Sequence, residues 1–354
     1  MKELAFYRGK RVLITGHTGF KGMWLALLLV RAGAKVTGFS LAAPTEGGKE
    51  ALCRLGVLSE MDDIRGVVRD FAALSRAFDA ARPEVVFHLA AQPIVRESYR
   101  IPVDTFAANV MGTVHLLECV RRADTVRSVL VVTTDKVYEN KEWAWGYREN
   151  EPLMGYDPYS ASKSCAEIVV YSYRQSFFLG GQVRLSSARA GNVIGGGDFA
   201  PDRIIPDCIR AAVRGDTIAI RSPHSTRPYQ HVLEPLTAYL MLAARQCEDA
   251  AYASAWNVGP DDVDCVTTGA LAELFCRAWG DGAHWEARTA DGPHEAHFLK
   301  LDCSKLRTAF GWHPRWHIES AVQKTVEWAK AWQSGADMRA VTEQQITAFL
   351  KGEA

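Results

Sequence analysis

The sequence has little of what marks a nucleic-acid-binding, membrane or secreted protein. Lysine plus arginine and aspartate plus glutamate both number 41, so no net charge attracts nucleic acid or anionic lipid. The apolar run 24–30 is too short to cross a bilayer, and residues 1–10 do not resemble a secretory signal. The eight cysteines form no CxxC pair and no metal-finger spacing. We therefore expect reduced, buried thiols in a cytoplasmic protein without nucleic-acid or membrane partners.

What the first half of the chain does have is an alternation of short apolar segments with helical patterns. The expected strands are 11–14, 35–39, 67–69, 84–89, 127–132 and 182–188, and the expected long helices are 23–32, 102–122 and 159–177. This order predicts an α/β fold with a doubly wound, Rossmann-type parallel sheet.

The second half is looser and richer in glycine and proline. Further elements are expected as helices at 202–213, 233–245, 266–279 and 318–333 and as a strand at 255–258. We predict a Rossmann domain over 1–190, with a return segment near 231–260, and a smaller C-terminal α/β substrate lobe over 191–354.

A glycine-rich segment, Thr15-Gly-His-Thr-Gly-Phe-Lys-Gly22, joins the first strand to the first helix. The first glycine allows a tight turn, the second lets a pyrophosphate approach the backbone, and the third lets helix and strand pack closely. The helix N-terminus then offers free N–H groups to the phosphates. A purely structural turn is the alternative. The motif predicts a dinucleotide site made by Gly16, His17, Thr18, Gly19, Phe20, Lys21 and Gly22.

The ribose end of this site leaves the choice between NAD and NADP open. NAD sites usually place an acid after the second strand, whereas here Ser40 lies in a stretch with neither an acid nor an arginine. Asp70 could accept a hydrogen bond from the adenine amino group, or it could cap the helix that begins at Phe71. The small apolar residues Leu89, Ala90 and Ala91 suit passage beside a dinucleotide.

Tyr159 and Lys163 are four residues apart at the start of a predicted helix, so both side chains project from one face. A nearby ammonium favours the phenolate, and Tyr159 could then take a proton from a substrate hydroxyl. The alternative is a packing tyrosine and a solvated lysine.

An acid and an amine, Asp135 and Lys136, directly follow Thr133 and Thr134 at the end of the fifth strand. An exposed Asp–Lys pair contributes only about 0–1 kcal/mol. Such a pair would not explain a position at the mouth of a buried strand.

The glycine motif, Thr133-Thr134 and the Tyr159–Lys163 pair follow one another along the chain in the order typical of the extended short-chain dehydrogenase/reductase family. The sequence resembles that family over nearly its whole length. Asn109 and Arg189-Ala-Gly-Asn-Val193 also fit its pattern. Thr134-Asp135 resembles the sugar-nucleotide 4,6-dehydratase branch, most of which carries Thr-Asp-Glu where this chain has Thr-Asp-Lys. The glycine motif and Arg227-Pro-Tyr-Gln-His-Val-Leu-Glu-Pro235 are similar to those of the dehydratases that act on CDP-glucose.

The resemblance implies NAD as cofactor, CDP-glucose as substrate and a role for each catalytic residue. Tyr159 would deprotonate the sugar 4-hydroxyl, Lys163 would hold the ribose, and Thr134 would bond to the 4-oxygen. Thr133 would lie beside the cofactor. Asp135 would protonate the leaving 6-oxygen. Lys136 occupies the place of the base at C5, where it acts either as that base or as an electrostatic helper.

The resemblance also implies ligands for the sugar nucleotide, and a homodimer through helices 102–122 and 159–177. The expected substrate ligands are Gln92, Thr134, Asn192, Arg227, His231 and His297, and the last of these stands where related dehydratases carry an arginine. His294, Glu295 and His297 could suggest a metal, but the reaction needs none and no metal is expected.

Three rival functions are an epimerase on the same scaffold, a non-catalytic dinucleotide sensor and an ordinary alcohol dehydrogenase. Asp135 and Lys136 argue against the epimerase, which has no elimination to catalyse. Tyr159 and Lys163 argue against the sensor. The dehydrogenase would consume NAD in proportion to product.

Overall fold

The computed structural model describes residues 2–288 and 296–353, and its contacts divide the chain into two compact units. Unit 1 comprises residues 1–139, 149–190 and 236–257, and unit 2 comprises 140–148, 191–235 and 258–354. The units therefore interleave along the chain: 236–257 belongs to unit 1 and falls within the expected return segment near 231–260, whereas 140–148 belongs to unit 2. The segment 140–148 joins unit 2 because the side-chain amide of Asn140 donates to the carbonyl of Phe298 and the backbone N–H of Tyr147 donates to the carbonyl of Lys300.

Unit 1 is built on a seven-stranded sheet, which confirms the predicted doubly wound α/β fold. The strand order is β11-β6-β5-β4-β1-β2-β3. The strands are β1 (Arg11–Thr15), β2 (Lys35–Ser40), β3 (Asp62–Arg65), β4 (Val85–His88), β5 (Ser128–Val132), β6 (Arg184–Ala190) and β11 (Ala255–Val258). Neighbours from β3 to β6 pair in parallel. The central strands are apolar because helices cover both of their faces.

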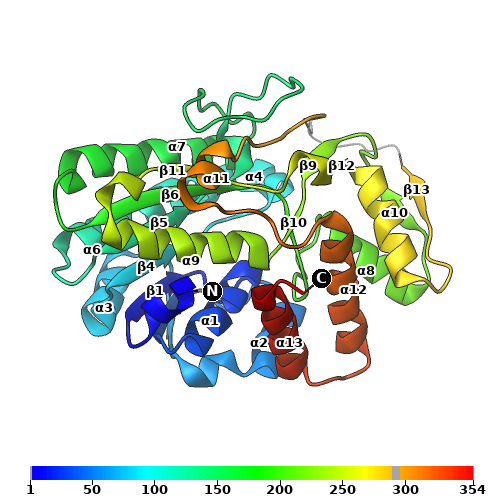
Figure 1. Ribbon diagram of the computed structural model, residues 1–354, viewed down its shortest axis with the longest axis horizontal. Helices are drawn as coiled ribbons and strands as arrows, with labels where there is room; N and C mark the ends of the chain where they lie inside the picture. The colour runs from blue at the N-terminus through cyan, green and yellow to red at the C-terminus, as the bar shows by residue number, and fades with distance from the viewer. Residues whose placement is uncertain (1, 289–295, 354) are drawn as a thin grey trace. The chain divides into compact units, whose positions relative to one another are not determined.

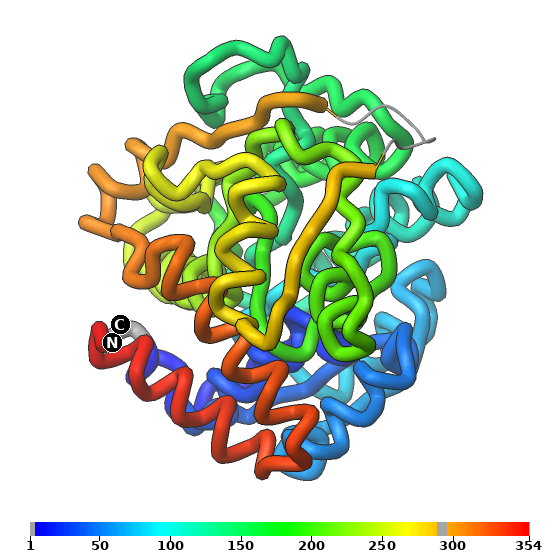
Figure 2. Tube along the Cα trace, turned by 90° about the vertical axis from the view of Figure 1, so that its right-hand side faces the viewer, coloured from blue at the N-terminus to red at the C-terminus, as the bar shows by residue number. Residues whose placement is uncertain are grey.

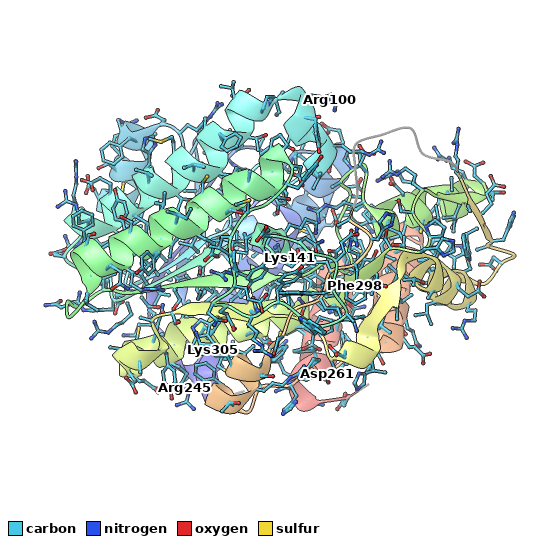
Figure 3. The ribbon with its side chains drawn as sticks, turned by 90° about the horizontal axis from the view of Figure 1, so that it is seen from above. Arg100, Lys141, Arg245, Asp261, Phe298 and Lys305 are labelled. Atoms are coloured by element: carbon cyan, nitrogen blue, oxygen red, sulfur yellow. The ribbon has the colours of Figure 1, made fainter. Side chains whose placement is uncertain are left out.

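Helices lie on both sides of these strands (Figures 1 and 3). They are α1 (Phe20–Arg31), α2 (Glu46–Leu55), α3 (Phe71–Ala81), α4 (Val95–Arg100), α5 (Pro102–Phe106), α6 (Gly112–Arg122), α7 (Pro158–Tyr173) and α9 (Leu233–Glu248). Val129 packs in the apolar core with α3, α6 and α7. Its neighbour Ser128 donates to the carbonyl of Ala243 on α9. Alternate residues of β5 thus face opposite helix layers. Figure 3 shows α7 and α9 on either side of the strands, and its labels mark Arg100 at the end of α4 and Arg245 on α9.

One prediction for unit 1 needs correction, and two predicted helices are present with π-helical turns. The third strand is Asp62–Arg65, which pairs with Thr37–Ser40, and not the apolar segment 67–69. As the edge strand, β3 is buried less than the central strands and needs no apolar run, which is why its polar sequence was missed. The predicted helices 102–122 and 159–177 each contain a π-helical turn, at Ala107–Met111 and Arg174–Phe178.

Unit 2 contains α8 (Ile204–Arg214), α10 (Thr268–Trp279), α11 (Ser304–Phe310), α12 (Ile318–Gln333) and α13 (Met338–Lys351). Its strands pair two by two: β7 (Val193–Ile194) with β10 (Gln230–His231), β9 (Thr226–Pro228) with β12 (Cys265–Thr267), and β8 (Ile218–Ile220) with β13 (Trp285–Ala287). Figure 2 shows β13 running alongside α10. The predicted strand at 255–258 exists as β11. It lies in the expected return segment near 231–260 and belongs to the large sheet of unit 1. Among the helices of residues 2–288 and 296–353, none has the length and apolarity that a membrane crossing requires.

Candidate active site

The glycine-rich segment lies between β1 and α1, as predicted, and its three glycines have different reasons to be glycine. Gly16 has φ +81°, and a Cβ there would lie 2.7 Å from the nitrogen of Ala90. At Gly22 a Cβ would lie 2.1 Å from the carbonyl oxygen of Gly16. Gly19 is different, because the nearest described atom to its Cβ would be the oxygen of Gly16, at an ordinary 3.5 Å. The protein itself does not require a glycine at 19, whereas a ligand that approaches the backbone does.

The N-terminus of α1 is suited to an anion. Among the described residues, no side chain caps it and no acid lies in its first turn. The positive end of the helix dipole therefore suits a phosphate at this terminus. This arrangement fits the pyrophosphate of a dinucleotide.

The polar side chains of the same segment tie it to the ends of β2 and β3. His17 is fully buried, and its Nε2 lies 2.8 Å from Oδ1 of Asp63. Burial lowers the pKa of His17, while the hydrogen bond to Asp63 acts in the opposite direction. The hydroxyls of Thr18 and Ser40 are 2.8 Å apart, and Thr18 donates to the carbonyl of Leu41. Ser40 is thus part of the framework of the turn.

The ribose end includes two residues that the sequence did not predict, Asp63 and Arg65. Of the two roles considered for Asp70, the structure shows the helix cap, since its Oδ1 accepts from the N–H of Ala73 at 2.9 Å, and the adenine contact stays a prediction. Asp63 is the carboxylate that contacts the glycine-rich segment. Arg65 brings an arginine to the end of β2, because it donates to the carbonyl of Leu41 at 3.0 Å and to Asp63 at 2.6 Å. Sequence reasoning missed Asp63 and Arg65 because it placed β3 five residues too late. The polar run Asp62–Arg65 was the available signal.

The loop after β4, residues 89–92, is fixed by Asn109. The Asn109 side chain accepts from the N–H of Gln92 at 2.8 Å and donates to its carbonyl at 3.1 Å and to Ser162 on α7 at 2.9 Å. The amide of Gln92 itself bonds to Thr105 and to the N–H of Ile94. Asn109 therefore joins the loop that carries Leu89, Ala90 and Ala91 to the helix of Tyr159. The role of Gln92 as a substrate ligand stays a prediction.

Thr134, Asp135 and Lys136 follow β5 in a short 3-10 turn, Asp135–Val137. Thr134 donates to Oδ1 of Asp135 at 2.9 Å, and Nζ of Lys136 lies 3.2 Å from the same oxygen. Asp135 is 1% exposed, and its Oδ2 has no hydrogen-bond partner within residues 2–288 and 296–353. An unpaired buried oxygen costs roughly 1–3 kcal/mol, which a bound hydroxyl would offset. This is not a solvated surface pair.

Tyr159 and Lys163 share one face of α7. Asp157 caps this helix by accepting from the N–H of Ser160 at 3.0 Å, so Tyr159 lies in the first turn and Lys163 one turn later. Both are buried, and Nζ of Lys163 donates to the carbonyl of Val132, the last residue of β5, at 3.1 Å. Burial lowers the pKa of Lys163 to about 8, while the charge of Glu167 opposes this change. The side chains of Tyr159 and Lys163 thus lie at the same end of β5 as Asp135.

Glu167 is a site residue that sequence reasoning missed. Its carboxylate accepts from the hydroxyls of Thr133 and Ser187 and from Arg189. The hydroxyl of Thr133 is thus bonded to Glu167, and its predicted contact with the cofactor stays a prediction. The available signal was position: Glu167 lies four residues after Lys163, on the same helix face.

The remaining predicted substrate ligands belong to unit 2. Arg227 is 8% exposed and donates to the carbonyls of Thr226 and Ala296. The N–H of His297 donates to Glu142, its carbonyl accepts from Thr226, and the carbonyl of Asn192 accepts from Gln230.

His231 is fully buried and lies edge-on to Trp316, 4.8 Å between ring centres. Burial, and secondarily the charge of Lys324, lowers its pKa to about 3. The structure thus places His231 in the interior of unit 2, and its contact with substrate stays a prediction.

The segment around His297 is anchored by neighbours from 140–148. Asn140 donates to the carbonyl of Phe298 at 3.0 Å. Figure 3 labels Phe298 and Lys141, the residue that follows Asn140 in the chain. His294 and Glu295, considered above for a metal, lie outside the described residues. Within the described ranges, no group of three or more His, Cys, Asp or Glu side chains is placed to hold a metal ion.

Known proteins resemble this chain over most of its length. Residues 13–325 match the family model described as GDP-mannose 4,6 dehydratase. A CDP-glucose 4,6-dehydratase of Salmonella typhimurium is 48% identical over 356 aligned positions that cover 99% of each chain. A dTDP-glucose 4,6-dehydratase of Xanthomonas campestris is 27% identical and covers 89% of this chain and 92% of its own.

Two solved structures share the fold. The dTDP-glucose 4,6-dehydratase of Bacillus anthracis, in complex with NAD, has a TM-score of 0.77 at 20% identity and covers 94% of this chain and 99% of its own. The UDP-glucuronic acid 4-epimerase of Bacillus cereus, in complex with UDP-glucuronic acid and NAD, has a TM-score of 0.79 at 21% identity, with 91% and 99% covered. Taken with the family model and the 48% identical relative, the glycine-rich turn and the Tyr159–Lys163 pair lead to one assignment: the chain belongs to the GDP-mannose 4,6 dehydratase family.

Proposed function

We propose that this protein is an NAD-dependent CDP-glucose 4,6-dehydratase, a hydro-lyase that makes CDP-4-keto-6-deoxyglucose for deoxysugar synthesis. The relative that is 48% identical over 99% of both chains supports the substrate and the reaction. The observation that carries the proposal is the pair of the buried Asp135 and the part-exposed Lys136 at the end of β5. An elimination needs an acid and a base beyond the tyrosine, whereas an epimerase that only oxidises and reduces C4 needs neither.

Tyr159, Lys163 and Thr134 act on the 4-hydroxyl of the sugar. Tyr159 accepts the hydroxyl proton, and the ammonium of Lys163 favours its phenolate. Thr134 bonds to the same oxygen. Lys163 is held for this task by the carbonyl of Val132.

Asp135 and Lys136 act on the next step, the loss of water. Once C4 is a ketone, the C5 proton is acidic, and Asp135 delivers a proton to the 6-oxygen as it leaves. The unpaired Oδ2 of Asp135 is the atom suited to that contact. Lys136 either removes the C5 proton as a neutral amine or stabilises the enolate oxygen as an ammonium.

The glycine-rich turn fits NAD, with Gly19 and the uncapped N-terminus of α1 binding the pyrophosphate. When bound, NAD would supply a hydride acceptor for C4 and a hydride donor for C6, with no net consumption of the cofactor. Leu89, Ala90 and Ala91 would line its path, and Lys163 would hold its ribose. Arg227, with Asn192, His297 and His231, is assigned to the sugar nucleotide of the substrate, because a guanidinium suits a diphosphate.

A homodimer is part of the proposal. Large apolar side chains are exposed along α5 and its π-helical continuation and along α7: Val103, Phe106, Met111, Ile168 and Tyr171. Monomeric proteins seldom leave such a surface uncovered, and a second copy would bury it. Light scattering should give twice the monomer mass, and Ile168→Arg with Tyr171→Arg should give the monomer.

A cytoplasmic location is also proposed. All eight cysteines lie in the described ranges, and none is disulfide-bonded. Free thiols are typical of a reducing compartment.

One experiment tests the function. CDP-, dTDP-, UDP- and GDP-linked hexoses are incubated with the protein and NAD⁺ in deuterated water and read by mass spectrometry. Loss of water from CDP-glucose alone, with deuterium at C5 and no net NADH, is the expected result. An unchanged mass with an altered sugar configuration would establish the epimerase instead.

A further inference from the structure

A buried carboxylate, that of Glu167, lies near the end of β5 and accepts hydrogen bonds from three side chains. Glu167 is 3% exposed. One of its oxygens accepts from Thr133, which directly follows β5. The other accepts from Ser187 and from Arg189 on β6, both at 2.8 Å. Glu167 thus joins α7 to the two strands that flank the reaction groups.

The charges around Glu167 favour its ionised form. Burial opposes its charge, but the Arg189 guanidinium and the bonds from Thr133 and Ser187 outweigh burial and hold its pKa below the usual range. Arg189 also donates to the phenol of Tyr138 at 2.9 Å. Arg174 is a second cation that interacts with Glu167.

Lys163 is the third cation near Glu167 and the one that belongs to the catalytic pair. It lies one helical turn before Glu167 and is 6% exposed. The charge of Lys163 acts on Glu167 and on the buried His88. Burial and, secondarily, the charge of Lys163 lower the pKa of His88 to about 3, so its imidazole is neutral. Burial alone would favour a neutral Lys163, and the negative charge of Glu167 one turn away favours its ammonium form.

We propose that Glu167 is a positioning residue for the dehydratase: its carboxylate fixes Thr133, and with it the turn that carries Thr134 and Asp135, and it keeps Lys163 charged. This inference rests on the proposed function, because Lys163 and Thr134 act there on the 4-hydroxyl. The two effects separate, since the bond to Thr133 is geometric whereas the effect on Lys163 depends on charge.

The test is the pH dependence of kcat/KM for Glu167→Gln, which keeps the size of the side chain and removes its charge. The alkaline limb of the profile should move down by roughly one pH unit, because Lys163 loses its proton earlier. Glu167→Asp should restore most of that limb. A residue that only stabilises the fold would lower the rate by the same factor at every pH.

Two further variants keep the test decisive if the single variant folds poorly. Glu167→Gln together with Arg189→Gln removes both charges, so neither is left buried and alone, and its alkaline limb should move in the same direction. Thr133→Val keeps the charge of Glu167 and breaks only the bond, so kcat should fall about tenfold with unmoved limbs. The control is Asp124→Asn, which removes an exposed carboxylate paired with Arg82 and should change nothing.

NAD affinity measured across pH separates this inference from the proposed function. If wild-type protein does not dehydrate CDP-glucose, the proposed function fails, yet the pH at which NAD binding weakens should still fall in Glu167→Gln. If wild-type protein is active and both the rate profile and the NAD profile stay in place in the single and double variants, the inference on Glu167 is overturned.

Discussion

Nζ of Lys163 donates to the carbonyl oxygen of Val132 at 3.1 Å and so ties the catalytic helix to the last residue of the central strand β5. Because burial lowers the pKa of Lys163 to about 8, this ammonium is lost within the ordinary range of assays. We expect kcat/KM to fall as pH rises through about 8, since the neutral amine no longer favours the phenolate of Tyr159. Lys163→Arg should be less active, but its kcat/KM should stay constant to higher pH, because a guanidinium keeps its charge there. A wild-type rate that rises steadily beyond pH 9 would contradict this.

Removing the phenol hydroxyl tests the first proton transfer. Tyr159→Phe should lower kcat by about 10²–10⁴-fold, because the 4-hydroxyl loses its base. NAD binding, measured by titration, should stay within about twofold of wild type because the pyrophosphate turn and Lys163 are unchanged. Near-normal turnover would remove Tyr159 from its assigned role.

The side chain of Lys136 tests the elimination step separately. Lys136→Ala should leave oxidation at C4 in place and slow the exchange of the C5 proton with deuterated solvent. NADH absorbance in a single turnover reports the first step, and mass spectrometry reports the exchange. An unchanged exchange rate would mean that Lys136 is not the base, and a loss of both steps would point to a role in shaping the turn around Asp135.

A buried carboxyl in unit 2 predicts how stability depends on pH. Glu234 is 1% exposed, and its Oε1 accepts from the N–H groups of Arg315 and Trp316, both at 2.8 Å. Burial raises its pKa from 4.5 to about 7, against the two hydrogen bonds. The folded state therefore keeps a proton that the unfolded state releases. The stability contributed by this proton is complete below about pH 4.5 and is lost as pH rises towards 7.

Glu234→Gln should remove this dependence, because a neutral amide keeps the accepting oxygen. A shift of this size corresponds to an upper bound of roughly 3 kcal/mol. Urea unfolding at several pH values should show a fall between pH 5 and 7 in wild type that is absent in the variant. The exposed Glu46→Gln serves as the control. Parallel curves for wild type and Glu234→Gln would contradict the assignment.

The parts of the fold that the sequence predicted are those fixed by local pattern. Strands β1, β4 and β5 are central and apolar, and the spacing of Tyr159 and Lys163 alone places them on one helix face. What escaped prediction depends on partners far along the chain. The edge strand β3 is polar because it lies at the sheet border, and the role of Glu167 depends on Ser187 and Arg189, whose contact with it arises only when β6 pairs with β5.

The glycines of the nucleotide turn offer a matched pair of substitutions. At Gly19 a Cβ meets its nearest described atom at 3.5 Å, so Gly19→Ala should fold and melt like wild type. It should nevertheless weaken NAD binding by roughly tenfold or more, because the methyl group would occupy the place of the pyrophosphate.

At Gly16, φ is +81° and the Cβ would lie 2.7 Å from the nitrogen of Ala90. Gly16→Ala should therefore lower the melting temperature as well as the affinity. Thermal unfolding with and without NAD separates the two effects. Normal NAD affinity in Gly19→Ala would mean that the dinucleotide does not approach the backbone at this glycine.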